Sequence, residues 1–98
     1  MYNEEPKNEV LQIIFKSREE IIHFVDVCNK YDDAIYVRVN KKSTDAKSIM
    51  GMLLMKVGEP LTIEYGCYDD EDNYEEFRKE IMEQFQVTAV PVKKAAEE

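Results

Sequence analysis

The chain has 98 residues, of which 44% are hydrophobic and 35% are charged. This length suits one compact domain, and we expect a single domain over 1–98 with a core of about 8–85 and a C-terminal tail over 86–98. The formal net charge of −8 disfavours nucleic acid and anionic membrane surfaces as partners, because both would repel the protein. No apolar run approaches the roughly 18 residues that span a bilayer, and Met1–Glu9 is too polar for a signal peptide. We therefore expect a cytoplasmic protein.

The first half of the chain predicts a strand, a helix and two further strands. Val10–Phe15 is a dense apolar run of strand length. Ser17 and Glu20 have the spacing of a capping box, in which the serine caps a helix and the glutamate closes its first turn. Ala34–Val39 is rich in β-branched residues, and a short edge strand is expected over Lys42–Asp45. The helix between them has an apolar stripe at spacings of three and four, formed by Ile21, Phe24, Val25, Cys28 and Tyr31.

The second half predicts a short helix, a strand and a longer helix. Ser48–Met55 is an apolar stretch opened by a serine, and Gly51 is an unfavourable residue inside the short helix. Gly58–Pro60 ends this stretch, and Leu61–Cys67 alternates as a strand does. From Gln86 the chain is expected to be a tail, in which Val87, Val90 and Val92 either add a strand or lie loose; Pro91 and the charged C-terminus favour the loose form. The longer helix has an apolar stripe formed by Tyr74, Phe77, Ile81 and Phe85.

Two segments resemble HPr, the small phosphocarrier of the sugar phosphotransferase system. They are Lys30–Ile35 (KYDDAI) and Lys47–Gly51 (KSIMG), and the second matches the start of the family's short second helix. The order of elements over about 8–85 is also similar to that of the family. The resemblance implies an α+β fold, an open-faced β-sandwich in which three helices cover a four-stranded antiparallel sheet in the order βαββαβα.

The family's phosphorylated histidine has no equivalent in this sequence. In HPr, that histidine begins the first helix, takes phosphate from Enzyme I and starts a histidine–alanine–arginine–proline run. Here Ser17 stands at or near its position, followed by Arg18, Glu19 and Glu20. We expect Ser17 to be an N-cap, and the two glutamates to repel an incoming phosphoryl group. The single histidine, His23, lies deeper in the helix and is expected to be a surface residue. The resemblance therefore implies a protein without histidine phosphocarrier activity and without a catalytic residue.

A second site of the family is better retained. Ser48 matches the regulatory serine that a dedicated kinase phosphorylates in many Gram-positive HPr proteins. A helix N-terminus would stabilise a phosphoserine there, and Lys47 is close in sequence; the alternative is that Ser48 only caps the helix. Ile49, Met50 and Leu53, together with Lys47, match the protein-binding patch of the family. The alternative for these apolar residues is that several of them point into the core.

The leading interpretation is a regulatory or protein-binding module related to the phosphotransferase system, not an enzyme, in which phosphorylation of Ser48 would be the switch. It is similar in kind to the catabolite-repression paralogue of HPr, and its implied bacterial partners are HPr kinase or a transcriptional regulator. We expect a monomer or weak dimer. One alternative is an unorthodox phosphocarrier that accepts phosphate from Enzyme I on Ser17 or His23. Another is that the fold persists in an unrelated binding role.

No cofactor or metal site is expected from the sequence. The acidic run Asp69–Asn73 lacks the glycine and the glutamate that an EF-hand loop needs, and a solvated loop is expected there. Cys28 and Cys67 are too few for a disulfide framework, and their spacing matches no metal motif.

Overall fold

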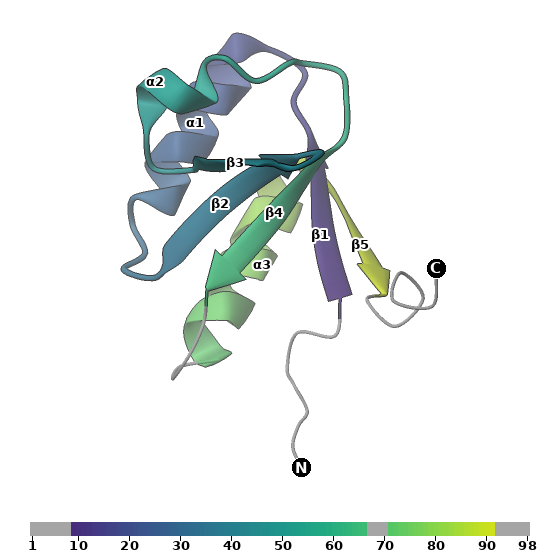
Figure 1. Ribbon diagram of the computed structural model, residues 1–98. Coiled ribbons are helices and arrows are strands. Elements are labelled where there is room, and N and C mark those ends of the chain that lie inside the picture. Colours follow the sequence, from purple (N-terminus) through teal and green to yellow (C-terminus); the bar gives the residue numbers. More distant parts are fainter. Residues whose placement is uncertain (1–8, 67–70, 92–98) are drawn as a thin grey trace.

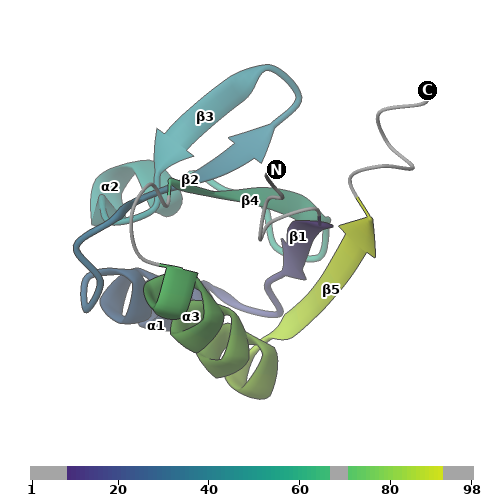
Figure 2. The same ribbon diagram turned by 90° about the horizontal axis from the view of Figure 1, so that it is seen from below.

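The computed structural model describes residues 9–66 and 71–91. These residues form one antiparallel sheet with strand order β3-β2-β4-β1-β5. Helices α1 and α3 lie side by side on one face of the sheet, and α2 lies near β3 (Figures 1 and 2). The predicted α+β fold with an antiparallel sheet and three helices is confirmed. The elements are, in chain order, β1 (Glu9–Ile14), α1 (Arg18–Cys28), β2 (Ala34–Val39), β3 (Lys42–Asp45), α2 (Ile49–Met52), β4 (Leu61–Gly66), α3 (Glu71–Gln84) and β5 (Gln86–Pro91).

The sheet has five strands, so the prediction of four strands and of a loose tail from residue 86 is wrong. β5 pairs with β1 along its whole length, from Ile14 opposite Gln86 to Glu9 opposite Pro91. Successive side chains of a strand point to opposite faces, and this alternation brings Val87 and Ala89 against the core. Pro91 ends an edge strand, where a missing N–H group is tolerated.

The core lies between the helices and one face of the sheet. Both predicted apolar stripes are buried, on α1 and on α3. They pack against side chains of the inner strands, namely Leu11, Ile13, Ile35, Val37, Leu61 and Ile63. Phe24 is central to this packing, because its ring centroid lies 5.3 Å from that of Phe15 and 5.6 Å from that of Phe85, in edge-to-face geometry. Such aromatic pairs add to the stabilisation that burial alone gives.

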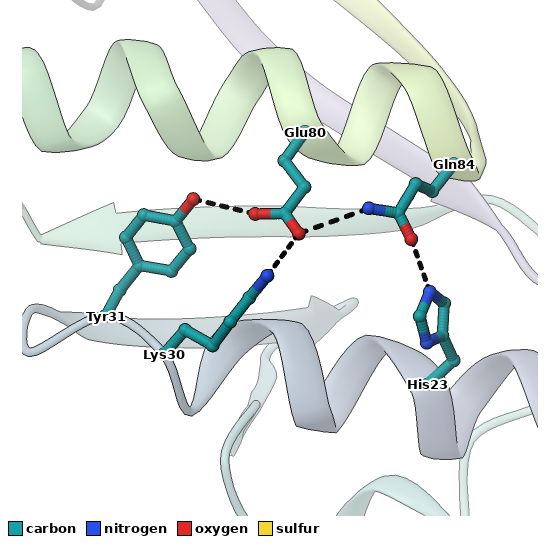
Figure 3. A network of polar contacts seen from close by, with 5 residues as sticks. All are labelled: His23, Lys30, Tyr31, Glu80 and Gln84. Carbon is teal, nitrogen blue, oxygen red and sulfur yellow. Dashed lines mark hydrogen bonds and ion pairs between the residues drawn. The ribbon is translucent and has the colours of Figure 1, made fainter.

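A chain of polar contacts joins α1 to α3 at the rim of this core (Figure 3). The Glu80 carboxylate accepts hydrogen bonds from the Tyr31 hydroxyl at 2.8 Å and the Lys30 ammonium at 2.5 Å. It also accepts one from the Gln84 amide at 3.1 Å, and Gln84 Oε1 is in turn hydrogen-bonded to His23 Nε2. The hydrogen bond from Lys30 lowers the pKa of Glu80, against burial, with help from Tyr31 and Gln84. The network therefore fixes the two helices relative to each other.

Candidate phosphorylation and protein-binding sites

Ser17 is the N-cap of α1, as predicted. Its hydroxyl oxygen accepts a hydrogen bond from the Glu20 amide at 3.3 Å. The Glu20 carboxylate reaches back to accept a hydrogen bond from the Lys16 amide at 2.9 Å. This pair of hydrogen bonds resembles a capping box. In a capping box the glutamate would accept from the amide of the N-cap residue itself, whereas here it accepts from the residue before it. The first turn of α1 is thus closed by its own side chains.

The first turn of α1 carries two carboxylates that disfavour a phosphoryl group, while the exposed cations Lys16 and Arg18 flank Ser17. Glu19 and Glu20 both lie in the first turn of α1, where carboxylates complement the positive end of the helix dipole. A phosphate on Ser17 would stand at the start of the same helical turn as both glutamates, and the like charges would repel. Within the described residues, the only hydrogen bond that Ser17 Oγ makes is the capping bond, so no general base contacts it.

His23 lies on α1 at the boundary with α3, away from the start of the helix. Its Nε2 is hydrogen-bonded to Gln84 Oε1, and its ring centroid lies 5.1 Å from that of Phe85. The Gln84 amide nitrogen donates to Glu80, so Gln84 links His23 to the Glu80 carboxylate. The structure therefore places His23 in the α1–α3 contact, as Figure 3 shows.

Ser48 is the N-cap of α2. Its hydroxyl accepts a hydrogen bond from the Gly51 amide at 3.4 Å, and the side chain is half-buried. Ser48 therefore caps the helix, which the alternative interpretation of this residue expects, and its capping bond is about as long as that of Ser17. Gly51 itself faces β3, because a Cβ atom on it would lie 2.8 Å from Thr44 Cγ2. This contact explains a glycine within so short a helix: it lets α2 pack closely on β3.

The position of Lys47 next to Ser48 suggests that its ammonium group could neutralise a phosphate there. In the structure the ammonium group has a different partner. The ammonium donates a hydrogen bond to the Tyr31 carbonyl beyond the C-terminal end of α1. The Lys47 amide donates to an Asp45 carboxylate oxygen at 2.9 Å, and the Ser48 amide donates to the Asp45 carbonyl at 3.0 Å. The nearest charged neighbours of Ser48 along the chain are thus Lys47, whose ammonium group is already hydrogen-bonded, and the Asp45 carboxylate.

The apolar residues of α2 divide between the core and the surface. Met50 is 80% exposed and Ile49 39% exposed, whereas Leu53 is partly buried and packs against the core. Leu54 and Val57, which the sequence analysis did not single out, are 82% and 44% exposed. We call Ile49, Met50, Leu54 and Val57 the α2 patch. Exposed apolar side chains gathered in one short segment are a feature of protein-binding surfaces.

The described residues contain no group of three or more His, Cys, Asp and Glu side chains that could hold a metal ion. Cys28 is a buried free thiol, and burial raises its pKa to about 12. Cys67 and the start of the predicted acidic loop, Asp69 and Asp70, lie outside the described residues. No helix within 9–66 or 71–91 is long and apolar enough to cross a membrane.

Comparisons with known proteins agree on one family. Residues 20–86 match the family model described as the PTS HPr component phosphorylation site. The phosphocarrier protein HPr from Bacillus anthracis str. Ames is similar at 25% identity, over 70% of this chain and 92% of that chain, with a TM-score of 0.52. HPr-C-His from Thermoanaerobacter tengcongensis is similar at 26% identity, over 80% and 94%, with a TM-score of 0.59. No curated protein sequence matches significantly. Since the family model covers more than half of the chain, the chain belongs to the PTS HPr family.

Proposed function

We propose that this protein is a regulatory or protein-binding member of the HPr family, without histidine phosphocarrier activity, that is switched by phosphorylation at Ser48. It acts by contact with protein partners, such as an HPr kinase or a transcriptional regulator, and not as an enzyme. The α2 patch and Lys47 form the docking surface. We place it in the cytoplasm, where ATP and phosphoenolpyruvate are available to the enzymes that would phosphorylate it.

The absence of histidine phosphocarrier activity is supported by the residues at the start of α1. Ser17 occupies the capping position, and the Glu20 carboxylate accepts a hydrogen bond from the Lys16 amide just before it. The family model begins to match only at Glu20, after this segment. His23 is a poor substitute, because its Nε2 is hydrogen-bonded to Gln84 and its ring packs on Phe85. Both features support a protein that does not carry phosphate on histidine.

The second part rests on the place of Ser48 beside the α2 patch. Ser48 directly precedes Ile49 and Met50, two exposed members of the patch. A phosphate on its hydroxyl would add between one and two negative charges at the edge of this apolar surface. The docking surface would then favour a partner with arginine or lysine side chains around an apolar contact. Phosphorylation would change the capping bond from the Gly51 amide, which is 3.4 Å long.

The experiment is the intact mass of the full chain after two incubations, one with HPr kinase and ATP, the other with Enzyme I and phosphoenolpyruvate. We expect one phosphate from the kinase and none from Enzyme I. Ser48→Ala should abolish the kinase product. Ser43→Ala is the matched control, because Ser43 is an exposed serine on the neighbouring strand β3.

Each other outcome points to a different function. Phosphate transfer from Enzyme I would overturn the proposal, and its loss in Ser17→Ala or in His23→Gln would locate an unorthodox carrier residue. No phosphate from either enzyme would indicate a fold retained for an unrelated binding role. In that case Ser48→Ala and Ser48→Asp should bind every partner alike.

A further inference from the structure

A hollow of about 420 Å³ lies between the β2–β3 hairpin and the segment that joins α2 to β4. In Figure 1, this segment leaves α2 and passes over the end of the sheet before β4 begins. Val39, Met55 and Leu61 line the hollow; Leu61 belongs to the buried core, and the other two pack against it. Leu54, a member of the α2 patch, lies on its rim. A concave, largely apolar space of this size is typical of small-molecule sites.

The walls of the hollow are held in place from three sides. The hairpin is paired from Val39 opposite Lys42 to Tyr36 opposite Asp45. On the second side, the close approach of Gly51 to Thr44 keeps α2 against β3. On the third, the Gly58 amide donates a hydrogen bond to the Phe15 carbonyl at 2.8 Å, which ties the segment after α2 to the end of β1. A site formed before binding loses little conformational freedom when a ligand enters.

The charge at the rim is opposite to that of the whole molecule. Lys42 and Lys56 lie on the rim together with one carboxylate, that of Glu59. Neither lysine forms an ion pair or a side-chain hydrogen bond within the part of the chain that the structure describes. Three other cations are already paired: Lys30 with Glu80, Arg38 with Glu64, and Arg78 with Glu9. A chain with a net charge of −8 thus has two unpaired ammonium groups over an apolar floor.

We propose that this hollow binds a small amphipathic carboxylate. The ligand's anionic group would lie between Lys42 and Lys56, and its alkyl or aryl body would pack on Val39, Met55 and Leu61. A cation is disfavoured because the two ammonium groups outnumber Glu59, and a fully apolar molecule would leave both of them without a partner. The site does not depend on phosphorylation or on the docking function of the α2 patch.

The test is a titration of the full chain with octanoate, followed by the methyl signals of the protein in NMR spectra. We expect saturable shifts centred on Val39, Met55 and Leu61, and weaker binding of octylammonium, which has the same chain length and the opposite charge. The variant Lys42→Glu with Lys56→Glu should bind octanoate about tenfold more weakly and should prefer octylammonium, since two surface charge contacts of ordinary strength are reversed.

The matched control is Lys16→Glu with Arg18→Glu. These are two exposed cations near the start of α1, and their replacement changes the net charge by the same amount. The control should bind octanoate as the parent protein does, within about twofold at equal ionic strength. The proposal is overturned if octanoate gives no saturable shift, if octylammonium binds the parent equally well, or if both double variants lose octanoate binding alike. Shifts centred on Met50 instead would assign binding to the α2 patch and would also overturn it.

Discussion

Gly51 determines how closely α2 approaches the sheet. Its replacement by alanine has two opposing effects on stability, a gain in helix propensity and a steric overlap with Thr44. In an exposed helix, alanine is more favourable than glycine by about 1 kcal/mol. Here the added Cβ would lie 2.8 Å from Thr44 Cγ2, and the β-branched threonine cannot easily turn away. We expect the overlap to dominate, so Gly51→Ala should lower the free energy of unfolding by about 1–3 kcal/mol in urea titrations.

The control for Gly51→Ala removes the methyl group that it meets. Thr44→Ser keeps the hydroxyl and deletes Cγ2, so the double variant Gly51→Ala, Thr44→Ser should regain most of the stability lost by Gly51→Ala. If Gly51→Ala stabilises the protein in the Thr44 background, helix propensity outweighs the contact, and the account of close packing between α2 and β3 is wrong.

Glu9 is a carboxylate whose ionised form the folded protein stabilises. It accepts hydrogen bonds from Arg78 Nε at 2.5 Å and from the Tyr74 hydroxyl at 2.8 Å. Burial raises the pKa of Glu9, but the hydrogen bonds from Arg78 and Tyr74 and the charge of Arg78 outweigh it, so the pKa lies below its ordinary value. A group with a lowered pKa contributes stability above its unfolded pKa and loses it as the pH falls through the folded pKa.

We therefore expect Glu9→Gln to lower the free energy of unfolding by about 1–3 kcal/mol at neutral pH and by much less below the folded pKa of Glu9. Urea titrations between pH 7 and the acid limit of folding would measure both. Glu59→Gln is the control, because Glu59 is exposed and makes no ion pair within the described residues. A constant difference between Glu9→Gln and the parent at all pH values would contradict the linkage.

At the level of elements, β5 covers an edge of the sheet that would otherwise be open. It pairs with all of β1 and brings Val87 and Ala89 against the core. A chain that ends at Phe85 should be less stable by about 2–3 kcal/mol, from the apolar area of these two side chains. It should also associate more readily, because β1 would become an exposed apolar edge strand. Urea titration and sedimentation equilibrium measure the two effects.

The control for this truncation is a chain that ends at Pro91, which keeps the whole of β5. It should match the full chain in stability and in oligomeric state. If the chain that ends at Phe85 is equally stable and monomeric, β5 contributes little, and the sheet is in effect four-stranded.

The elements predicted from the sequence were those whose signal is local. The stripes of α1 and α3 recur over several turns, so periodicity alone identified the buried faces. β5 was considered but not favoured, because its stability comes from pairing with β1, far away in the sequence, while Pro91 next to charged residues is locally typical of a tail. The local sequence of β5 contains no information on whether the edge of β1 is available for pairing.

The same reasoning explains the candidate sites. Ser17 and Ser48 were predicted as caps because a cap is defined by a few adjacent residues. The exposed face of α2 was only partly predicted: with four helical residues there is about one turn, too few for periodicity to show that Leu54 faces outward and Leu53 inward. The hollow needs residues from β2, β3, α2 and β4, and no local pattern reveals such an assembly.

For the whole molecule, the excess of negative charge should govern how salt affects stability. The 21 acidic side chains outnumber the 13 basic ones, and their mutual repulsion destabilises the compact state. At about 10 mM salt the screening length is about 30 Å, so charges across the whole domain repel; at about 0.15 M it is about 8 Å. The ion pairs Lys30–Glu80 and Arg38–Glu64 are partly exposed and are each worth at most about 1 kcal/mol. We expect the relief of repulsion to exceed their weakening, so Tm should rise with sodium chloride.

The comparison that isolates net charge is the variant Glu76→Lys with Glu83→Lys, both on the exposed face of α3. Each replacement removes one negative charge and adds one positive charge, so the formal net charge changes from −8 to −4. Its Tm should exceed that of the parent at about 10 mM salt, and the two values should converge towards 0.3 M, as screening removes the difference. Equal salt dependence in parent and variant would show that specific ion binding or the ion pairs, and not the net charge, set the response. A fall in the parent's Tm with salt would show that ion pairs such as Arg78–Glu9 contribute more than the repulsion removes.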